Sequence, residues 1–266
     1  MYSFNYHTPT DLDEALKIYE NSDDPKYLAG GMTLIASMKQ RLASPSDLID
    51  LTKIDSLKSI SNEEGQIKIG ALATHNTISK NIEINEHIKG LKRLSTGIGD
   101  QAIRNFGTIG GSIANADPAA DWPAAILSIK TTIKTNKRQI AGEDFFTAMF
   151  ETALEENEIL THIIFEIPTY FTYIKFPNPA SRYAIAGIAL STYGKDVRIA
   201  ITGASHTPFR ASEIESALTE NFDLNNVPLN TIALEDMNND IHASAEYRSH
   251  LVDVLVKKAV KNFFKG

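Results

Sequence analysis

The sequence predicts an α+β fold in three successive regions, because helical and strand-like hydrophobic patterns are unevenly distributed along it. The N-terminal region has a strand, a helix and a second strand in order, which is typical of a parallel β–α–β unit. The middle region combines helical stretches with strands in which apolar and polar residues alternate. The last region has three strand patterns in succession, and helices fill the remainder.

The N-terminal region begins with an amphipathic helix expected at residues 10–20. A short strand at 26–29 stops at a pair of glycines, and Thr33 can cap the helix that comes next. The apolar face of this second helix would consist of Leu34, Ile35, Met38 and Leu42. A buried strand at 47–51 then completes the β–α–β unit, with the two strands parallel.

The later regions have clear strand patterns. Residues 66–71 and 159–167 alternate apolar and polar side chains, and helical stretches cover about 75–105. A glycine-rich turn is expected at 107–112. The elements expected in the last region are strands around Tyr173, at 185–193 and at 196–203, and a final helix at about 244–264.

The composition is that of an ordinary globular chain, with 42% hydrophobic and 22% charged residues among 266. A net charge of −7 without a clustered basic surface argues against nucleic-acid binding. We expect no membrane span, because no charge-free apolar run reaches the roughly 20 residues that one needs. The first residues also lack the pattern of a signal peptide, and the absence of cysteine fits a cytoplasmic protein.

Several kinds of reactive site are excluded or disfavoured. Without cysteine the chain has no disulfide, thiolate metal site, iron–sulfur cluster of its own or catalytic thiol. The seven histidines do not fall at metal-ligand spacing, so we predict no metal site, and we predict no catalytic acid–base residue. Residues 97–102 match G-x-G-x-x-A, but a charged, helical stretch precedes them. The match is therefore not interpreted as a dinucleotide-binding fingerprint, which requires a preceding strand.

Two glycine pairs are the main candidates for a binding site. Gly30-Gly31 lies between a strand and a helix, where backbone N–H groups and the positive end of the helix could meet a phosphate. Gly110-Gly111 is flanked by hydroxyls that can donate to phosphate oxygens. Each pair could instead be a tight turn that needs glycine for its backbone angles, the second followed by a small-residue core helix. Two such elements in one chain favour a pyrophosphate clamped between two loops.

The two elements resemble, with their surroundings, known motifs of the medium, flavoprotein subunits of carbon-monoxide dehydrogenase and xanthine dehydrogenase. Residues 29–39 resemble the first FAD-binding motif of that family, and residues 103–121 resemble the second. Residues 173–186 are similar to a third region, and residues 207–213 are similar to a motif of the C-terminal domain. The resemblance covers nearly the whole chain in the family's order.

This resemblance implies a non-covalently bound FAD, with the two glycine loops holding its pyrophosphate. The FAD contacts it assigns are Leu28, Ala29, Gly30, Gly31, Met32, Thr33, Leu34, Ile35, Ile98, Thr108, Ile109, Gly110, Gly111, Ser112, Asp121, Leu160, Lys175 and Ile185. Among them, Ile98 and Ile185 would flank the isoalloxazine ring. Met32 and Ser112 depart from the family, in which a small or polar residue and an asparagine are commoner at those places.

The resemblance also implies a complex. A small subunit would carry two 2Fe–2S clusters and a large subunit the molybdenum cofactor, assembled as a dimer of heterotrimers. This chain would be the electron-transfer subunit, which passes electrons from the clusters through FAD to an external acceptor. The substrate of the large subunit (carbon monoxide, a purine or an aldehyde) and the final acceptor stay open.

The implied α+β fold is a two-lobed FAD-binding domain of the vanillyl-alcohol-oxidase or PCMH type at 1–169, with lobes at about 1–56 and 57–169. A C-terminal domain at 170–266 would contain a three-stranded antiparallel sheet and helices. FAD would lie extended between the lobes, with its ring facing the C-terminal domain. Two rival hypotheses are a self-contained FAD-dependent oxidoreductase on this scaffold and an interaction subunit that has lost FAD. The first needs a base or nucleophile near the flavin, and the intact glycine pairs argue against the second.

Overall fold

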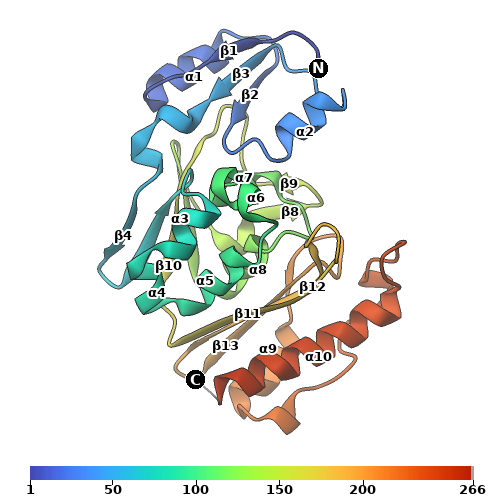
Figure 1. Ribbon diagram of the computed structural model, residues 1–266. Helices are drawn as coiled ribbons and strands as arrows, with labels where there is room; N and C mark the ends of the chain where they lie inside the picture. The colour runs from blue at the N-terminus through green and yellow to red at the C-terminus, as the bar shows by residue number, and fades with distance from the viewer. Residues whose placement is uncertain (265–266) are drawn as a thin grey trace.

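Three sheets of three to five strands divide the chain into three consecutive parts (Figure 1). The structure is a computed structural model that describes residues 1–264. The first part contains a parallel sheet in the order β1-β3-β2, as the β–α–β pattern predicts. Its elements are β1 (Asn5–His7), α1 (Leu12–Glu20), β2 (Pro25–Leu28), α2 (Leu34–Lys39) and β3 (Asp47–Asp50).

Helix α1 agrees with the sequence-based prediction, whereas α2 differs from it in length and in its N-terminal cap. Helix α1 begins after Asp11, whose carboxylate accepts a 2.8 Å hydrogen bond from the backbone N–H of Glu14. Helix α2 is shorter than expected, and Leu42 lies beyond its end with 77% of its surface exposed. Thr33 does not cap α2 through its side chain, because its own backbone is already helical whereas a capping residue is extended.

The second part has a five-stranded antiparallel sheet in the order β4-β5-β10-β6-β7, with helices packed on it. The strands are β4 (Ile60–Glu63), β5 (Gln66–Gly70), β6 (Thr131–Thr135), β7 (Gln139–Ala141) and β10 (Leu160–Glu166). The helices are α3 (His75–Lys80), α4 (Ile82–His87), α5 (Lys89–Thr96), α6 (Gln101–Phe106), α7 (Ile109–Asn115) and α8 (Trp122–Ser128). A small hairpin, β8 (Phe146–Ala148) and β9 (Glu151–Thr152), stands apart from the sheet.

The glycine-rich segment at 107–112 is not the turn that the sequence predicts. Gly110 and Gly111 lie in the first turn of α7, and Thr108 caps this helix by accepting a 3.0 Å hydrogen bond from the N–H of Gly111. A Cβ on Gly110 would come within 2.6 Å of the carbonyl oxygen of Ala71. Glycine is therefore needed here for close packing of the helix on the chain after β5.

The third part has a four-stranded antiparallel sheet in the order β11-β12-β13-β14, which corrects the expected three strands. The elements are β11 (Tyr170–Pro177), β12 (Ala184–Tyr193), β13 (Asp196–Thr202), β14 (Phe209–Arg210), α9 (Ser212–Glu220) and α10 (Ala245–Phe263). Strand β14 pairs with β13 through two residues only, which is too short for an alternating pattern. The neighbouring Pro208 has no N–H with which to lengthen it.

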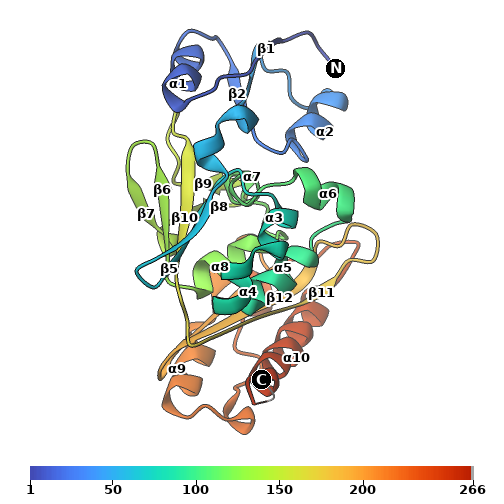
Figure 2. The same cartoon turned by 60° about the vertical axis from the view of Figure 1, so that its left-hand side comes forward.

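The third sheet lies between two layers of helices (Figures 1 and 2). Helices α9 and α10 pack on one side of it, and α5 and α8 of the second part pack on the other. Its apolar residues are accordingly divided between two cores, since Leu190 groups with the residues of α10 and Ala189 with those of the second part. Strand β12 is buried almost throughout, as this position requires.

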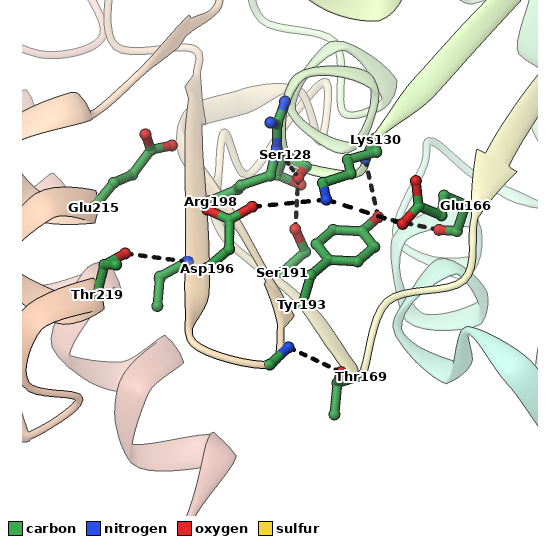
Figure 3. Close-up of polar contacts among 12 residues, drawn as sticks. Ser128, Lys130, Glu166, Thr169, Ser191, Tyr193, Asp196, Arg198, Glu215 and Thr219 are labelled. Carbon is green, nitrogen blue, oxygen red and sulfur yellow. Dashed lines mark hydrogen bonds and ion pairs between the residues drawn. The ribbon is translucent and has the colours of Figure 1, made fainter.

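Polar contacts join the second and third parts at the end of β12 (Figure 3). The backbone N–H of Lys130 donates to the hydroxyl of Tyr193 at 3.0 Å, and that hydroxyl donates to the carbonyl of Glu166 at 3.1 Å. The ammonium of Lys130 lies 4.4 Å from the centre of the Tyr193 ring. Nearby, the hydroxyl of Ser191 donates to the carbonyl of Ser128 at 2.5 Å. We refer to these five residues as the β12 seam.

Candidate functional site: a cavity between two glycine loops

A cavity of about 640 Å³ lies where the three parts of the chain meet. Its walls come from residues 26–34 and Leu51 of the first part, from residues between Ala71 and Leu160 of the second, and from 181–183 of the third. This volume lies within the range of small-molecule and cofactor sites.

The first glycine loop, residues 29–34, forms one wall. Gly31 has a φ of +71°, and a Cβ on Gly30 would come within 2.0 Å of the carbonyl oxygen of Phe106. Both positions therefore require glycine. Within the described residues, the N–H groups of residues 30–34 have no hydrogen-bond partner, although they lie beside the cavity. A run of free backbone donors around a glycine of positive φ is an anion-binding arrangement.

The second glycine loop, residues 107–112, is organised differently. Its backbone donors are already bonded, because the N–H groups of Ile109 and Gly110 donate to the carbonyls of Ala73 and Ala71 at 3.1 and 2.9 Å. That of Gly111 donates to Thr108, as described above. This loop therefore presents hydroxyls and a bare backbone to the cavity rather than free N–H groups.

The two loops come close to each other at one point. A Cβ on Gly111 would lie 3.4 Å from the Cβ of Ala29 in the first loop and 3.0 Å from the hydroxyl of Thr108. Residues of both loops line the cavity, Ala29 and Gly111 among them. The absence of a side chain at Gly111 thus keeps the space between the loops open.

A buried charged cluster lies where the cavity meets the third part. The carboxylate of Asp121 accepts hydrogen bonds from the Tyr173 hydroxyl and from the Lys175 ammonium, the latter at 2.9 Å. Lys175 also donates to the carbonyl of Arg182 at 2.7 Å, so the cluster fixes the loop between β11 and β12. Burial raises the pKa of Asp121, and Lys175 and Tyr173 oppose that shift by stabilising the ionised form.

The turn that contains Ile98 is held from two sides. Arg104 of α6 donates to the carbonyls of Ile98 and Gly99 at 2.9 Å each. Arg182, from the loop between β11 and β12, donates to the carbonyl of Gly99 at 3.0 Å. Ile98 therefore has a fixed place in the wall at the junction of the second and third parts.

A further carboxylate, Glu158, lies in the wall near the first part. It accepts hydrogen bonds from Arg138 at 3.1 Å, from the Thr135 hydroxyl at 2.7 Å and from the N–H of Glu155 at 2.8 Å. Burial by itself would raise the pKa of Glu158, but these donors together lower it to about 2. The group is therefore ionised and fully paired rather than a proton donor.

Most residues assigned from the resemblance lie in the cavity wall. The exceptions are Ile35, Ile109, Lys175 and Ile185, which do not line it. Lys175 lies behind the wall and donates a hydrogen bond to the wall residue Asp121. Ile185 is buried in the core of the third part, and its carbonyl accepts a hydrogen bond from Arg248 at 2.7 Å. The role of each assigned residue as an FAD contact, inside or outside the wall, stays a prediction.

The structure also places residues in the wall that sequence reasoning did not select. They include Tyr27, His75, Asp117, Glu158 and Tyr183. None lies in the glycine loops at 29–34 and 107–112, although Asp117 and Tyr183 fall in the longer segments that carry the resemblance. Their contribution depends on how distant segments pack. Within residues 1–264, no three His, Asp or Glu side chains are arranged to hold a metal ion. None of the helices in this range has the length and hydropathy of a membrane span.

Free backbone donors on one loop and hydroxyls on the other give this cavity the features of a site for a phosphate-bearing cofactor. Comparison with known families identifies the class of protein. A family model described as the FAD binding domain in molybdopterin dehydrogenase matches residues 2–169. Another, described as the CO dehydrogenase flavoprotein C-terminal domain, matches residues 171–263. The chain therefore belongs to the family of FAD-binding flavoprotein subunits of molybdopterin dehydrogenases, which confirms the resemblance.

Relatives and solved structures agree with this family. The chain is 33% identical to the glyceraldehyde dehydrogenase medium chain of Sulfolobus acidocaldarius, over 97% of each chain. It is 31% identical to the carbon monoxide dehydrogenase medium chain of Afipia carboxidovorans, over 97% of this chain and 96% of that one. Its fold matches a chain in the crystal structure of cyanide-inactivated Cu,Mo-CO dehydrogenase with a TM-score of 0.89 and 30% identity, covering 98% of this chain and 97% of that one.

Proposed function

We propose that the chain is the FAD-binding electron-transfer subunit of a molybdenum hydroxylase complex. The observation that carries this proposal is the cavity between the two glycine loops, in a chain whose residues 2–169 and 171–263 match the flavoprotein family. In this function the chain would take electrons from 2Fe–2S clusters of a partner and pass them to an external acceptor.

The residues of the cavity fit FAD in chemical terms. The free N–H groups of residues 30–34 would hold the pyrophosphate, and the hydroxyls of Thr108 and Ser112 would donate to it from the opposite side. Ala29 and Gly111 leave the space between the loops open for an extended ligand. None of these contacts is covalent, and the chain has no cysteine to tether a flavin.

FAD supplies the redox chemistry when it is bound, and the protein supplies binding, orientation and electrostatics. Ile98 would offer an apolar surface to the flavin ring, held in place by Arg104. The Asp121–Lys175 pair would fix the loop between β11 and β12 beside it. We propose a domain division at 169–170, with the flavin ring toward the C-terminal domain.

The proposed partners are a 2Fe–2S small subunit and a molybdenum-cofactor large subunit. The support is that several relatives are medium chains or FAD subunits by name, as in nicotine 6-hydroxylase of Paenarthrobacter nicotinovorans. A chain without cysteine must obtain electrons from clusters held elsewhere. A dimer of heterotrimers and a cytoplasmic location are part of this proposal. The rival of a self-contained oxidoreductase has no comparable support, since the matched relatives are subunits of larger enzymes by name.

The experiment is identification of the ligand that the purified chain retains or takes up. After reconstitution with FAD and removal of excess, heat or acid denaturation should release FAD that elutes with an FAD standard. FMN bound in preference to FAD, or no flavin retained by folded protein, would contradict the proposal.

A further inference from the structure

His75 is a buried ring in the cavity wall that the proposed function does not use. It is the first residue of α3, is 4% exposed and lines the cavity. Its backbone N–H donates to the carbonyl of Gly107 at 2.9 Å, and its ring packs on the same residue. A Cβ on Gly107 would come within 2.9 Å of Nε2 of His75. The ring therefore lies directly against the start of the second glycine loop.

One hydrogen bond fixes the tautomer of this ring. Nε1 of Trp122 lies 3.1 Å from Nδ1 of His75, and both side chains are buried. An indole N–H can only donate, so Nδ1 must accept and the proton of the neutral ring must be on Nε2. Protonation of Nδ1 would set two donors against each other.

The surroundings also keep the ring neutral. Burial, and to a smaller extent the charge of Arg104, lowers the pKa of His75 to about 4. At pH 7 His75 is thus an uncharged donor with a fixed orientation. Its Nε2–H has no hydrogen-bond acceptor within the part of the chain that the structure describes.

A fixed donor at a cavity wall without a protein acceptor indicates an acceptor on the ligand. We propose that His75 is a positioning residue that donates a hydrogen bond from Nε2 to an oxygen of the FAD section that meets the second glycine loop, with Trp122 fixing its tautomer. This inference rests on the proposed function and extends it. The donor matters because the backbone N–H groups of Ile109, Gly110 and Gly111 are already bonded within the protein.

The test compares FAD affinity among variants of the full chain, measured by quenching of flavin fluorescence. His75→Leu removes both ring nitrogens at similar size and should weaken binding about 10- to 100-fold, as expected for a lost hydrogen bond to a charged acceptor. His75→Gln keeps an N–H donor of similar reach and should restore most of the affinity. The control is His162→Leu, since His162 is half-buried in β10 and does not line the cavity.

A second measurement reports the tautomer and does not depend on FAD. Long-range ¹H–¹⁵N spectra of ¹⁵N-histidine-labelled protein should show His75 as the neutral Nε2–H form at pH 7. Trp122→Phe keeps the ring but removes its donor, so the His75 signals should shift toward mixed tautomers. FAD affinity should fall by less than in His75→Leu.

The outcomes separate this inference from the proposed function. Failure of the wild-type chain to bind FAD would contradict the function itself. Wild-type binding with unchanged affinity in folded His75→Leu would overturn the role of His75 alone, as would an Nδ1–H tautomer in the spectra. Circular dichroism establishes whether each variant is folded. Should His75→Leu not fold, equal FAD affinity of Trp122→Phe and wild type would overturn the inference, and a reduced affinity would support it.

Discussion

At the scale of single residues, the glycines of the two loops serve different purposes. Gly30 and Gly110 are needed by the fold, because a Cβ at either would meet backbone atoms within 2.6 Å or less. Gly111 has more room, since the nearest atoms to its Cβ are a hydroxyl at 3.0 Å and the methyl of Ala29 at 3.4 Å. The space that a side chain at Gly111 would fill is the gap between the loops.

We therefore predict that Gly111→Val abolishes FAD binding while the chain stays folded. The branched side chain would occupy the gap and displace the cofactor from both loops, which should weaken binding by about 100-fold or more if two contacts of about 1.5 kcal/mol each are lost. FAD titration and thermal unfolding of the apoprotein measure the two effects separately.

The matched variant is Gly110→Ala, in which the added methyl meets the backbone of Ala71 instead of the cavity. It should lower the melting temperature of the apoprotein more than Gly111→Val does, despite its smaller side chain. Full flavin occupancy in folded Gly111→Val would show that the second loop is a structural helix start and no part of the site.

A second prediction for a single residue concerns Glu158 and the dependence of folding stability on pH. Its pKa is about 2 in the folded chain against 4.5 when unperturbed, so the unfolded state binds the proton more readily. The resulting stability is present above about pH 4.5 and is lost as the pH falls toward 2. Glu158→Gln should therefore cost about 2 kcal/mol at pH 7 and should flatten the dependence of stability on pH between these values.

Urea unfolding of wild type and variant at several pH values between 3 and 7 measures this difference, with Glu156→Gln as the control. Glu156 is exposed, and neutralising it removes no buried interaction. Parallel pH curves for wild type and Glu158→Gln would mean that the folded state does not favour the ionised form of Glu158.

At the scale of elements, the sequence predicts strands whose apolar residues alternate, and it does not predict elements that depend on contacts with distant segments. The strands at 66–70 and 196–202 follow from the alternation of apolar residues, which burial on one face enforces. Strand β14 has two residues, and no pattern can show in so short a segment. Gly110 and Gly111 look like a turn in sequence but lie in α7. Contact with Ala71 explains the glycine at 110, and the nearness of Thr108 and Ala29 explains the glycine at 111.

The prediction at the scale of elements concerns the contribution of the β12 seam to stability. Tyr193→Phe removes a hydroxyl that joins Lys130 of the second part to the carbonyl of Glu166, and it leaves the N–H of Lys130 without its acceptor. We expect a loss of about 1–2 kcal/mol and a melting temperature lower by roughly 3–6 °C. Scanning calorimetry of the apoprotein measures both.

The control for this prediction is Tyr2→Phe, because Tyr2 is 55% exposed. Its melting temperature should equal that of the wild type. FAD affinity should be nearly unchanged in Tyr193→Phe, since the β12 seam does not line the cavity. An unaltered melting temperature in Tyr193→Phe would show that the Tyr193 hydroxyl contributes nothing to the joint between the second and third parts.

At the scale of the whole molecule, the cavity is a product of all three parts, and this limits what sequence could reveal. The glycine loops are visible as motifs because glycine is required at several of their positions, by backbone angle at Gly31 and by close packing at Gly30 and Gly110. His75 and Tyr183 are not visible, since each enters the wall only when α3 and the β11–β12 loop pack beside the loops. The resemblance supplied Asp121 and Lys175, and the structure adds that they form one ion pair that fixes the β11–β12 loop.

The last prediction concerns the molecule as one part of an enzyme. The FAD-loaded chain alone should not oxidise carbon monoxide, purines or aldehydes, because in this family those reactions need molybdenum and electron exit through iron–sulfur clusters. The chain has no cysteine for cluster ligands, and residues 1–264 arrange no metal-binding group of carboxylates and histidines. Adding the partner subunits should restore substrate-dependent bleaching of its flavin absorbance, whereas Gly111→Val should assemble but show no such bleaching. Turnover of one of these substrates by the lone chain at enzymatic rates would make it a self-contained oxidoreductase. The substrate-side base would then be expected at Asp117, which lines the cavity and whose pKa is raised by burial.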